Sequence, residues 1–546
     1  MRRVVPALIV AVICALAPVP ASAAAARVTA EFAQESVWGT GYGGRITLTN
    51  TGDAESTGWV VEFDLPPGTS VTNSWSSVLT RDGQRHRFAN AAHNGRAPPG
   101  GAVGFGFTAS GGGLPAGCVV DGVPCRGPAR DTTPPTAPTE PRVTGVTAGS
   151  VSLSWRAAAD DTGVVDYQVL SGAEVVTTTS ATSATATGLL PGTAHAFTVR
   201  ARDAAGNTSA PSPVVTATTA PAASTVDVAT AAQLRAALAA AAPGVTIRLA
   251  PGVYRGSFTA TSPGTAAAPI TLTGPADAVL VNDGPSGSGP ACPVPTAGWD
   301  PGYGLWLHGA PHWNLVGFTV RESKKGIVVD DSRHTVIDRV RVHHVDEEGV
   351  HFRRSSSDGV LRGSTISHTG LVRPGYGEGV YLGSAHSNWD CHGNTGGADR
   401  SDRVLVLGNH IGPHVTAEPI DVKEGTAGGV VRGNTFDGTG ISGQNSADSW
   451  IDVKGSGYLV EDNTGSFAAP GTFANGYETH NPVTTPAFPN GCGNTWRGNR
   501  SDLGGVGAYA IRITSTSKCA GLPNVVHASN TVTRAVTGLT NIPVTP

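Results

Sequence analysis

Two short segments of the chain place an aspartate two residues before a lysine. Asp421 and Lys423 lie in AEPIDVKEG, and Asp452 and Lys454 lie in DSWIDVKGS. Lysine is scarce, with five in 546 residues. Two neighbouring ammonium groups repel each other, which lowers the pKa of at least one of them. We therefore predict that the two lysines act in acid–base chemistry near neutral pH, the alternative being an ordinary ladder of surface ion pairs.

Other groups that can carry charge or stack occur in related segments. His351 and Arg353 lie in GVHFR, and Tyr381 lies in GVYLG. A glutamate stands just before each of these segments and before PIDVK: Glu348, Glu378 and Glu418. Whether these groups meet depends on the elements that carry them.

The segments belong to a pattern that recurs at spacings of about 22 to 45 residues, as in a solenoid rung with its loops. They read GLWLH from Gly304, GIVVD from Gly326, GVHFR from Gly349, GVYLG from Gly379, PIDVK from Pro419, WIDVK from Trp450 and GYETH from Gly476. A second set of strands carries Ser364, Asn409, Asn434, Asn463 and Asn499 at one equivalent position. Stacked asparagines bond to the copies above and below, so we predict a right-handed parallel β-helix over residues 226–546, opened by an amphipathic helix near Leu234.

Side chains alternate between the two faces of a strand, which sorts this β-helix into inward and outward columns. The first outward column is Trp306, Val328, His351, Tyr381, Asp421, Asp452 and Glu478. The second is His308, Asp330, Arg353, Gly383, Lys423, Lys454 and His480. Rungs stack about 4.8 Å apart, so these columns should form one continuous charged surface, which we call the outward strip.

Two shorter regions precede the β-helix, and their alternating strands between Gly, Pro and Asn turns predict β-sandwiches. They cover residues 26–126 and 142–218, with Pro/Thr-rich linkers over 127–141 and 219–225. The expected fold class is therefore all-β, with a right-handed parallel β-helix preceded by two β-sandwich modules.

The first module contains tryptophans that differ in their surroundings. Trp59 lies in an apolar strand, whereas Trp38 and Trp75 stand among small polar residues. Exposed indoles stack on the apolar faces of sugar rings. Trp38 before a Gly-Tyr-Gly turn, Trp59 in GWVVEF, Trp75 and the GFGF strand resemble the family 2 cellulose-binding modules. The resemblance implies binding to cellulose or a related glycan; the usual third aromatic platform is replaced by His93.

The second module resembles a fibronectin type III domain. Trp155 in SVSLSW, Tyr167 in VDYQVL and the run LLPGTAHAFTVRARDAAGNTSAPS carry this resemblance. The module contains no group that suggests catalysis, so we expect it to be a spacer.

The segment AEPIDVKEG, followed one rung later by DSWIDVKGS, resembles polysaccharide lyase family six, the group of alginate lyases and chondroitinase B. The resemblance implies that Glu418 binds calcium, that Lys423 is the base and that Lys454 assists as the acid. Thr416 stands where the family has a second calcium glutamate, and Gly455 stands where it has a histidine.

Glu378 and Asp421 can still complete an oxygen site for calcium with Glu418. The leading hypothesis is β-elimination on a uronate polysaccharide, with pectic material favoured by the cellulose-type module. Lys423 is then the base, and Lys454 or His351 is the acid. In the same hypothesis Arg353 binds the substrate carboxylate, and Tyr381 stacks on the sugar or donates a proton.

Two other functions fit the same scaffold. Inverting glycoside hydrolysis needs carboxylates about 6.5–9.5 Å apart, which Glu418, Asp421, Asp448 and Asp452 can supply. A wall-binding protein would use the β-helix only to hold a glycan.

The start of the chain and its cysteines predict the compartment. Residues 1–25 combine Arg2 and Arg3, a short apolar run and Ala21-Ser22-Ala23, which is typical of a secretory signal peptide. Six cysteines remain after cleavage, and sequence proximity pairs Cys118 with Cys125, Cys492 with Cys519 and Cys292 with Cys391. With a net charge of −4, we expect a secreted monomer that binds polysaccharide and neither nucleic acid nor membrane.

Overall fold

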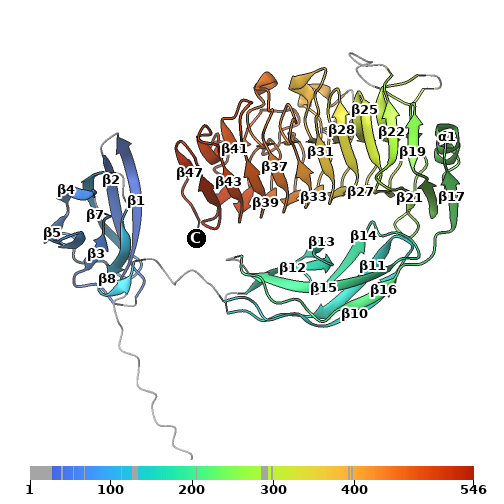
Figure 1. Ribbon diagram of the computed structural model, residues 1–546. Helices are drawn as coiled ribbons and strands as arrows, with labels where there is room; N and C mark the ends of the chain where they lie inside the picture. Colours follow the sequence, from blue (N-terminus) through green and yellow to red (C-terminus); the bar gives the residue numbers. More distant parts are fainter. Residues whose placement is uncertain are drawn as a thin grey trace, which may run out of the picture. The chain divides into compact units, whose positions relative to one another are not determined.

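The computed structural model describes most of the chain between residues 28 and 545. The described residues are 28–38, 41–52, 54–66, 68–111, 114–125, 133–161, 163–203, 206–284, 293–296, 299–390, 394 and 397–545, without the side chains of Val37 and Trp38. The chain divides into two compact units, Met1–Arg130 and Asp131–Pro546 (Figure 1). The predicted signal peptide lies outside the described residues, and among these no helix is long and apolar enough to cross a membrane.

The first unit is a β-sandwich, as its alternating strands predict. One sheet has the order β1 (Val28–Trp38), β2 (Gly41–Asn50), β7 (Ala102–Ser110), β4 (Ser70–Trp75). The other has the order β5 (Ser77–Asp82), β6 (Arg85–Asn90), β3 (Val60–Asp64), β8 (Ala116–Val120), β9 (Val123–Pro124). Aromatic side chains fill the space between them, with Trp59 stacked on Phe105 at 5.2 Å between ring centroids. The predicted disulfide between Cys118 and Cys125 is confirmed.

The second unit opens with another β-sandwich. Its sheets have the orders β10 (Thr139–Val146), β11 (Ser150–Arg156), β14 (Ser183–Thr187) and β13 (Glu174–Thr179), β12 (Val164–Ser171), β15 (Ala194–Asp203), β16 (Val215–Thr218). Strand β10 begins inside the linker predicted over 127–141, and Thr136 already bonds to Ala159. The short linker 219–225 is also bonded at both ends, through Ala220 to Thr147 and through Ala223 to Gly244.

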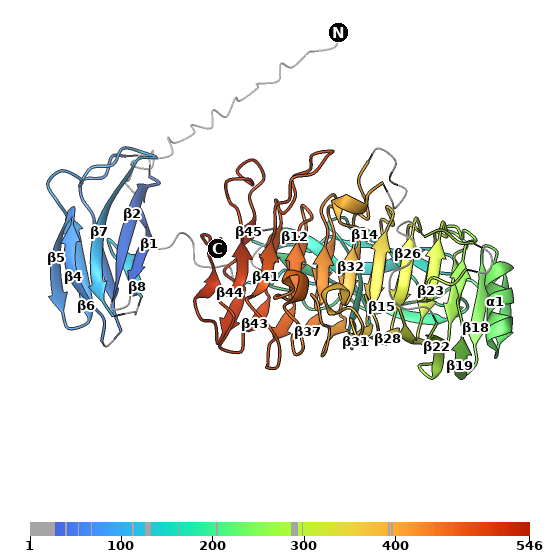
Figure 2. The same ribbon diagram turned by 90° about the horizontal axis from the view of Figure 1, so that it is seen from above.

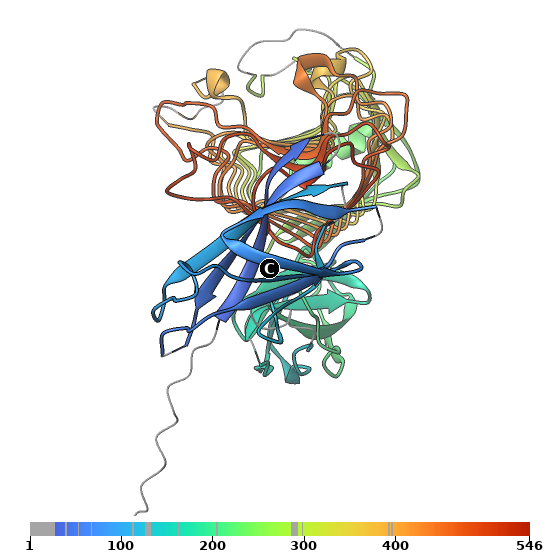
Figure 3. The same ribbon diagram turned by 90° about the vertical axis from the view of Figure 1, so that its left-hand side faces the viewer.

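The rest of the second unit is the predicted parallel β-helix, which Figure 3 shows end-on. Sheet 1 contains β17 (Ser224–Val228), β18 (Val245–Leu249), β21 (Ile270–Thr273), β24 (Trp313–Val316), β27 (Val336–Asp338), β30 (Val360–Arg362), β33 (Leu405–Leu407), β36 (Val430–Arg432), β39 (Leu459–Glu461), β42 (Thr495–Arg497) and β45 (Val525–Val526). Sheet 2 contains β19 (Gly252–Arg255), β22 (Ala278–Asn282), β25 (Thr319–Ser323), β28 (Arg341–Val345), β31 (Thr365–Ser367), β34 (His410–Ile411), β37 (Thr435–Asp437), β40 (Thr464–Ser466), β43 (Arg500–Asp502) and β46 (Thr531–Thr533). Sheet 3 contains β20 (Thr259–Ala260), β23 (Tyr303–His308), β26 (Lys325–Asp330), β29 (Val350–Arg353), β32 (Val380–Leu382), β35 (Ile420–Val422), β38 (Ile451–Val453), β41 (Asn475–Thr479), β44 (Tyr509–Ile513) and β47 (Gly538–Thr540).

Two predicted features close and support this solenoid. Helix α1 (Ala231–Ala239) begins in a capping box of Thr230 and Gln233 and buries Leu234 against the first rungs. The asparagine ladder is also confirmed, because each side-chain N–H donates to the carbonyl oxygen of the next asparagine at 2.8–3.0 Å. Its members are Asn409, Asn434, Asn463, Asn499 and, beyond the prediction, Asn530.

Short 3-10 helices and a disulfide lie in the loops beside sheet 3. The 3-10 helices are η1 (Pro374–Tyr376), η2 (His386–Asn388) and η3 (Gln444–Ser446). Cys492 and Cys519 form the predicted disulfide. The predicted partners Cys292 and Cys391 lie outside the described residues.

The fibronectin-like module packs along sheet 1 of the β-helix (Figures 1 and 2). Arg202 of β15 is buried at this contact and bonds to Asp166 of its own module and to Glu461 of β39. Arg432 and Arg497 pair with the same glutamate from neighbouring rungs. Because this charged cluster is buried, the module is a fixed part of the second unit, a contact that the sequence did not predict.

Candidate functional site

The outward strip is charged across the middle strands of sheet 3, whereas at one end its predicted members Trp306 and Val328 are buried in an apolar cluster. Strand pairing places Tyr381 of β32 beside Asp421 of β35, and Asp421 beside Asp452 of β38. His351 of β29 pairs with Tyr381 on the other side. The residues between them along each strand are buried in the core, including Ile420. Alternation along the strand therefore forces the polar residues outward.

Two aspartates and two lysines form one continuous network in this strip. Lys423 Nζ lies 2.6 Å from Asp421, and Lys454 Nζ lies 3.0 Å from the other oxygen of Asp421. Lys454 also bonds to Asp452, and His480 Nδ1 lies 2.7 Å from Asp452. Each of the two rungs carries one aspartate and one lysine, so each ammonium group lies beside at least one carboxylate.

This pairing corrects the prediction that at least one of the two lysines has a lowered pKa. Burial by itself lowers the pKa of Lys423, but the adjacent Asp421 outweighs it and the pKa ends above its usual value. The pKa of Lys454 is raised in the same way by Asp421 and Asp452. Both side chains are therefore ammonium groups at neutral pH, because Asp421 lies between them, as in the ladder of ion pairs that the sequence left as the alternative.

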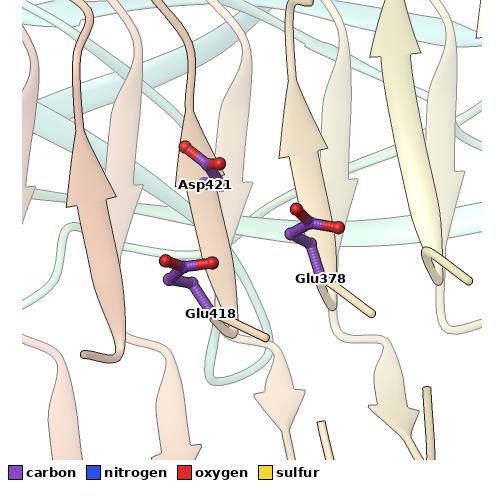
Figure 4. Close-up of side chains that lie close together, drawn as sticks. All are labelled: Glu378, Glu418 and Asp421. Atoms are coloured by element: carbon purple, nitrogen blue, oxygen red, sulfur yellow. The ribbon is translucent and has the colours of Figure 1, made fainter. Parts of the chain in front are cut away.

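Three carboxylates gather at the edge of the strip where strands β32 and β35 begin. Glu378, Glu418 and Asp421 each have an oxygen within 4.8 Å of the others, and Figure 4 shows them on two adjacent rungs. Burial, Glu348 and Asp421 raise the pKa of Glu378 to about 8. Burial, together with Asp421 and Glu378, raises the pKa of Glu418 well above its usual value.

One oxygen of this group stands out. Glu378 is almost completely buried, and its Oε2 has no hydrogen-bond partner among the described residues. An unpaired buried carboxylate oxygen is costly unless a proton or a cation satisfies it. Oxygen ligands of this kind suit hard divalent cations such as calcium, so the chemistry of the three predicted ligands fits a cation.

A histidine and a tyrosine continue the strip on the other side of Lys423. His351 is buried, its Nε2 donates to the Gly383 carbonyl at 2.9 Å, and its ring packs edge-on against Tyr381 at 4.4 Å. Lys423 Nζ lies 5.0 Å from the centre of the Tyr381 ring. Burial and the nearby Asp421 raise the pKa of Tyr381 well above 10. Tyr381 is partly exposed, so it can reach a ligand lying on the strip.

Arg353 does not have the role predicted for it. It lies in the outward column, but Asp330 on the preceding rung binds it through two hydrogen bonds, one of 3.0 Å. Tyr303 lies against the same guanidinium, which is buried. A guanidinium held in this way is not presented to a substrate carboxylate.

Two further titratable residues belong to this region: His480, for which no chemical role was predicted from the sequence, and Asp448, which was named only for the hydrolysis alternative. His480 is partly exposed, and its hydrogen bond to Asp452 raises its pKa. Burial and Glu478 raise the pKa of Asp448 to about 6. The position of His480 in the second outward column was the sequence feature that could have indicated its contact with Asp452.

The first module carries its own candidate binding residue. Trp75 is 41% exposed, and a side chain added at Gly106 of β7 would collide with the indole ring. The ring therefore lies close over the backbone of β7. Trp59 is buried in the core as predicted, while the side chain of Trp38 lies outside the described residues.

Comparisons with known families divide the chain as the structure does. Residues 28–125 match the cellulose binding domain, residues 136–218 match the fibronectin type III domain, and residues 303–476 match the right handed beta helix region.

The two N-terminal modules have curated relatives. Chitinase C of Streptomyces lividans is 43% identical over 197 residues, which are 36% of this chain and 32% of that protein. A cellulose/chitin binding protein of Mycobacterium bovis is 40% identical over 133 residues, which are 23% of this chain and 89% of that protein. The chain spans about a third of the length of the two Streptomyces chitinases that it matches.

The β-helix has a solved relative. The alginate lyase from Paenibacillus sp. str. FPU-7 is 34% identical, with a TM-score of 0.51, and the match covers 59% of this chain and 99% of that one. This chain therefore joins a family 2 cellulose-binding module and a fibronectin type III domain to a β-helix that belongs to the family of the Paenibacillus alginate lyase.

Proposed function

We propose that the β-helix cleaves a uronate-containing polysaccharide by β-elimination, while the first module holds the protein on a cellulose- or chitin-type glycan. The observation that carries this proposal is the position of Lys423, between the carboxylate group of Glu378, Glu418 and Asp421 and the phenol of Tyr381. The alginate lyase relative supports a uronate polymer and moves alginate ahead of the pectic material favoured by the sequence.

The three carboxylates are the proposed ligands of a divalent cation, with calcium as the first candidate. Such a cation, when bound, would neutralise the substrate carboxylate and so make the C5 proton more acidic. Glu378 and Asp421 belong to adjacent rungs, so the rigid stacking of the strands fixes the separation of these ligands.

Proton transfer is assigned to the groups next to this cluster. In β-elimination a base removes the C5 proton, the bond from C4 to the leaving oxygen breaks, a C4–C5 double bond forms, and the leaving oxygen gains a proton. Because Asp421 keeps Lys423 protonated, we assign Lys423 to the proton donation and not to the base role predicted from the sequence. Tyr381 is partly exposed, and because its raised pKa keeps the phenol protonated, we assign it to stacking on the sugar or to proton donation, as predicted from the sequence.

Lys454 and Asp452 support this arrangement from the next rung. Lys454 bonds to both aspartates, and Asp452 in turn bonds to His480. These contacts fix the carboxylate of Asp421 between the two ammonium groups. We therefore assign Lys454 and Asp452 a positioning role.

To test this proposal, the full chain is incubated with alginate, polygalacturonate, glucuronan and xylan, with and without added calcium, and ultraviolet absorbance and new reducing ends are measured. We expect an ultraviolet-absorbing unsaturated product from a uronate polymer, and we expect Lys423→Ala to abolish it. Lys518→Ala removes an exposed lysine in the loop after β44, outside the rungs of Lys423 and Lys454, and serves as the matched control. New reducing ends without ultraviolet absorbance would indicate hydrolysis instead, and binding without either product would indicate a glycan-binding protein.

The geometry is less suited to inverting hydrolysis. The oxygens of Glu378, Glu418 and Asp421 lie within 4.8 Å of one another, whereas an inverting pair of carboxylates is separated by about 6.5–9.5 Å. Asp421 and Asp452 are also each paired with lysine, and both lysines are protonated. A carboxylate already paired with an ammonium group is a weak proton acceptor.

A further inference from the structure

The loop of residues 370–377, which leads into β32, exposes a group of apolar side chains. Leu371, Val372 and Tyr376 are 52%, 54% and 48% exposed, and the side chain of Arg373 between them is 38% exposed. Clustered exposed apolar groups mark ligand-binding surfaces more often than singly exposed ones do. The loop therefore combines apolar surface with a cationic group.

This loop is held from both sides by neighbouring rungs. Its backbone N–H groups donate to the carbonyls of Val345 and Asp346 on the preceding rung at 3.1–3.3 Å. On the other side, the side chains of Thr416 and Asn445 each donate to a carbonyl of the loop at 3.0 Å. A ligand that binds to a loop fixed in this way does not have to order it first, which favours binding.

Arg373 and Tyr376 form one unit within the loop. The guanidinium carbon of Arg373 lies 4.0 Å from the centre of the Tyr376 ring. Arg373 also donates to Glu347 at 3.0 Å, and Glu347 is buried and paired with Lys325 at 3.2 Å. The guanidinium is thus fixed over one face of the ring, and the orientation of both groups is set by a buried carboxylate.

The loop lies next to the carboxylate cluster. Tyr376 is two residues before Glu378, so their Cα atoms are at most about 7 Å apart. A polysaccharide chain that reaches Glu378, Glu418 and Asp421 along this side has to pass the loop.

We propose that Arg373 and Tyr376 form a subsite for a second uronate residue of the substrate, beside the residue that reacts. The sugar ring lies against the exposed part of Tyr376, and its carboxylate pairs with Arg373. Aromatic rings take the apolar face of a sugar, and a guanidinium binds a carboxylate with directional hydrogen bonds. This inference rests on the proposed function, and it adds that the enzyme recognises charge on more than one sugar of the chain.

The test measures binding to the full chain carrying Lys423→Ala, so that the ligand is not cut. Isothermal titration compares a mannuronate hexasaccharide with mannohexaose, which has the same backbone without carboxylates. We expect Arg373→Ala to weaken binding of the mannuronate ligand about tenfold and to leave mannohexaose within about twofold. Tyr376→Ala should weaken binding of the mannuronate ligand about three- to tenfold, and Tyr376→Phe should match the parent. Arg341→Ala, which removes an exposed arginine on sheet 2, is the matched control.

Unchanged mannuronate binding by Arg373→Ala overturns the proposal, and so does a parent protein that binds no mannuronate hexasaccharide. A loss of binding by Arg341→Ala equal to that of Arg373→Ala also overturns it, because the effect would then be one of overall charge. Thermal melting by circular dichroism shows whether each variant is folded. If the subsite variants weaken binding but the unmodified protein makes no unsaturated product, the proposal of β-elimination is wrong and the proposal of the subsite is supported. If product forms and the variants bind normally, only the proposal of the subsite is wrong.

Discussion

Replacing Glu461 with glutamine tests how the fibronectin type III module is attached to the β-helix. Glu461 is completely buried on β39, where it accepts hydrogen bonds from Arg202 at 2.7 Å and from Arg497 at 2.5 Å. Arg432 contacts the same carboxylate. Glutamine has nearly the same shape but no charge, so it leaves three guanidinium groups around a neutral amide.

The size of the effect follows from the pKa of Glu461. Burial alone raises the pKa of a carboxyl group, yet Arg432 and Arg202 lower that of Glu461 to about 2. A displacement from 4.5 to about 2 corresponds to about 3 kcal/mol of stability. Removing one partner of a buried ion pair costs about 3–5 kcal/mol of stability, which agrees with the value from the pKa. We therefore expect Glu461→Gln to lower the free energy of unfolding by about 3 kcal/mol at neutral pH.

The dependence on pH provides a second check. The pKa of Glu461 is lower in the folded state than in the unfolded chain, where it is 4.5. The contribution of Glu461 to stability is therefore complete above pH 4.5 and is lost as the pH falls toward 2. The difference in free energy of unfolding between Glu461→Gln and the unmodified chain should therefore be constant from pH 7 to about 5 and become smaller below pH 5.

Urea unfolding followed by tryptophan fluorescence measures both quantities. Asp502→Asn, which breaks an exposed pair with Arg534, is the control and should change stability by less than about 1 kcal/mol. If Glu461→Gln is as stable as this control at pH 7, the buried network does not hold the module on sheet 1. The module would then be the spacer that the sequence predicts.

Three other outcomes are expected. Asn434→Ala removes one rung of the buried amide ladder and should cost about 2 kcal/mol in urea unfolding, while exposed Asn388→Ala should cost almost nothing. Trp75→Ala should release the protein from cellulose or chitin in a pull-down assay, while Val78→Ala on the other sheet should not. A chelator should abolish formation of the unsaturated product, and added calcium should restore it; full activity after chelation contradicts the cation proposal.

The columns of the β-helix were predictable because two periodicities act together. Alternation along a strand and parallel stacking in register determine which residues lie beside Asp421, and strand pairing confirms both neighbours. The asparagine ladder was predictable for the same reason, since only an inward stack keeps one residue type at one position.

The charge balance within the columns was harder to judge. The prediction gave the repulsion between Lys423 and Lys454 more weight than their pairing with Asp421, which lies between them. The pairing of Arg353 with Asp330 could likewise have been predicted from the second outward column, because the two residues occupy the same position on adjacent rungs. Each case required the sum of all neighbouring charges and not a single pair.

The contact between module and β-helix could not be predicted in this way. Arg202 and Glu461 lie in separate domains, 259 positions apart, and each resembles an ordinary surface residue of its own strand. Alternation within one domain says which side chains face outward, but it does not say which of those surfaces a second domain covers. Only the arrangement in space shows that both residues are buried.

The balance of charge at the outward strip also explains why a uronate is a reasonable substrate. Glu378, Glu418, Asp421 and Asp452 carry up to four negative charges, and Lys423 and Lys454 supply two positive ones. Burial and this excess of negative charge together raise the pKa values of Glu378 and Glu418. A substrate carboxylate adds a further negative charge, so it can approach only if protons or a divalent cation supply positive charge. A neutral glycan needs no such compensation. The buried acidic cluster is therefore better explained by a site that brings a cation and a uronate together than by one that hydrolyses a neutral polymer.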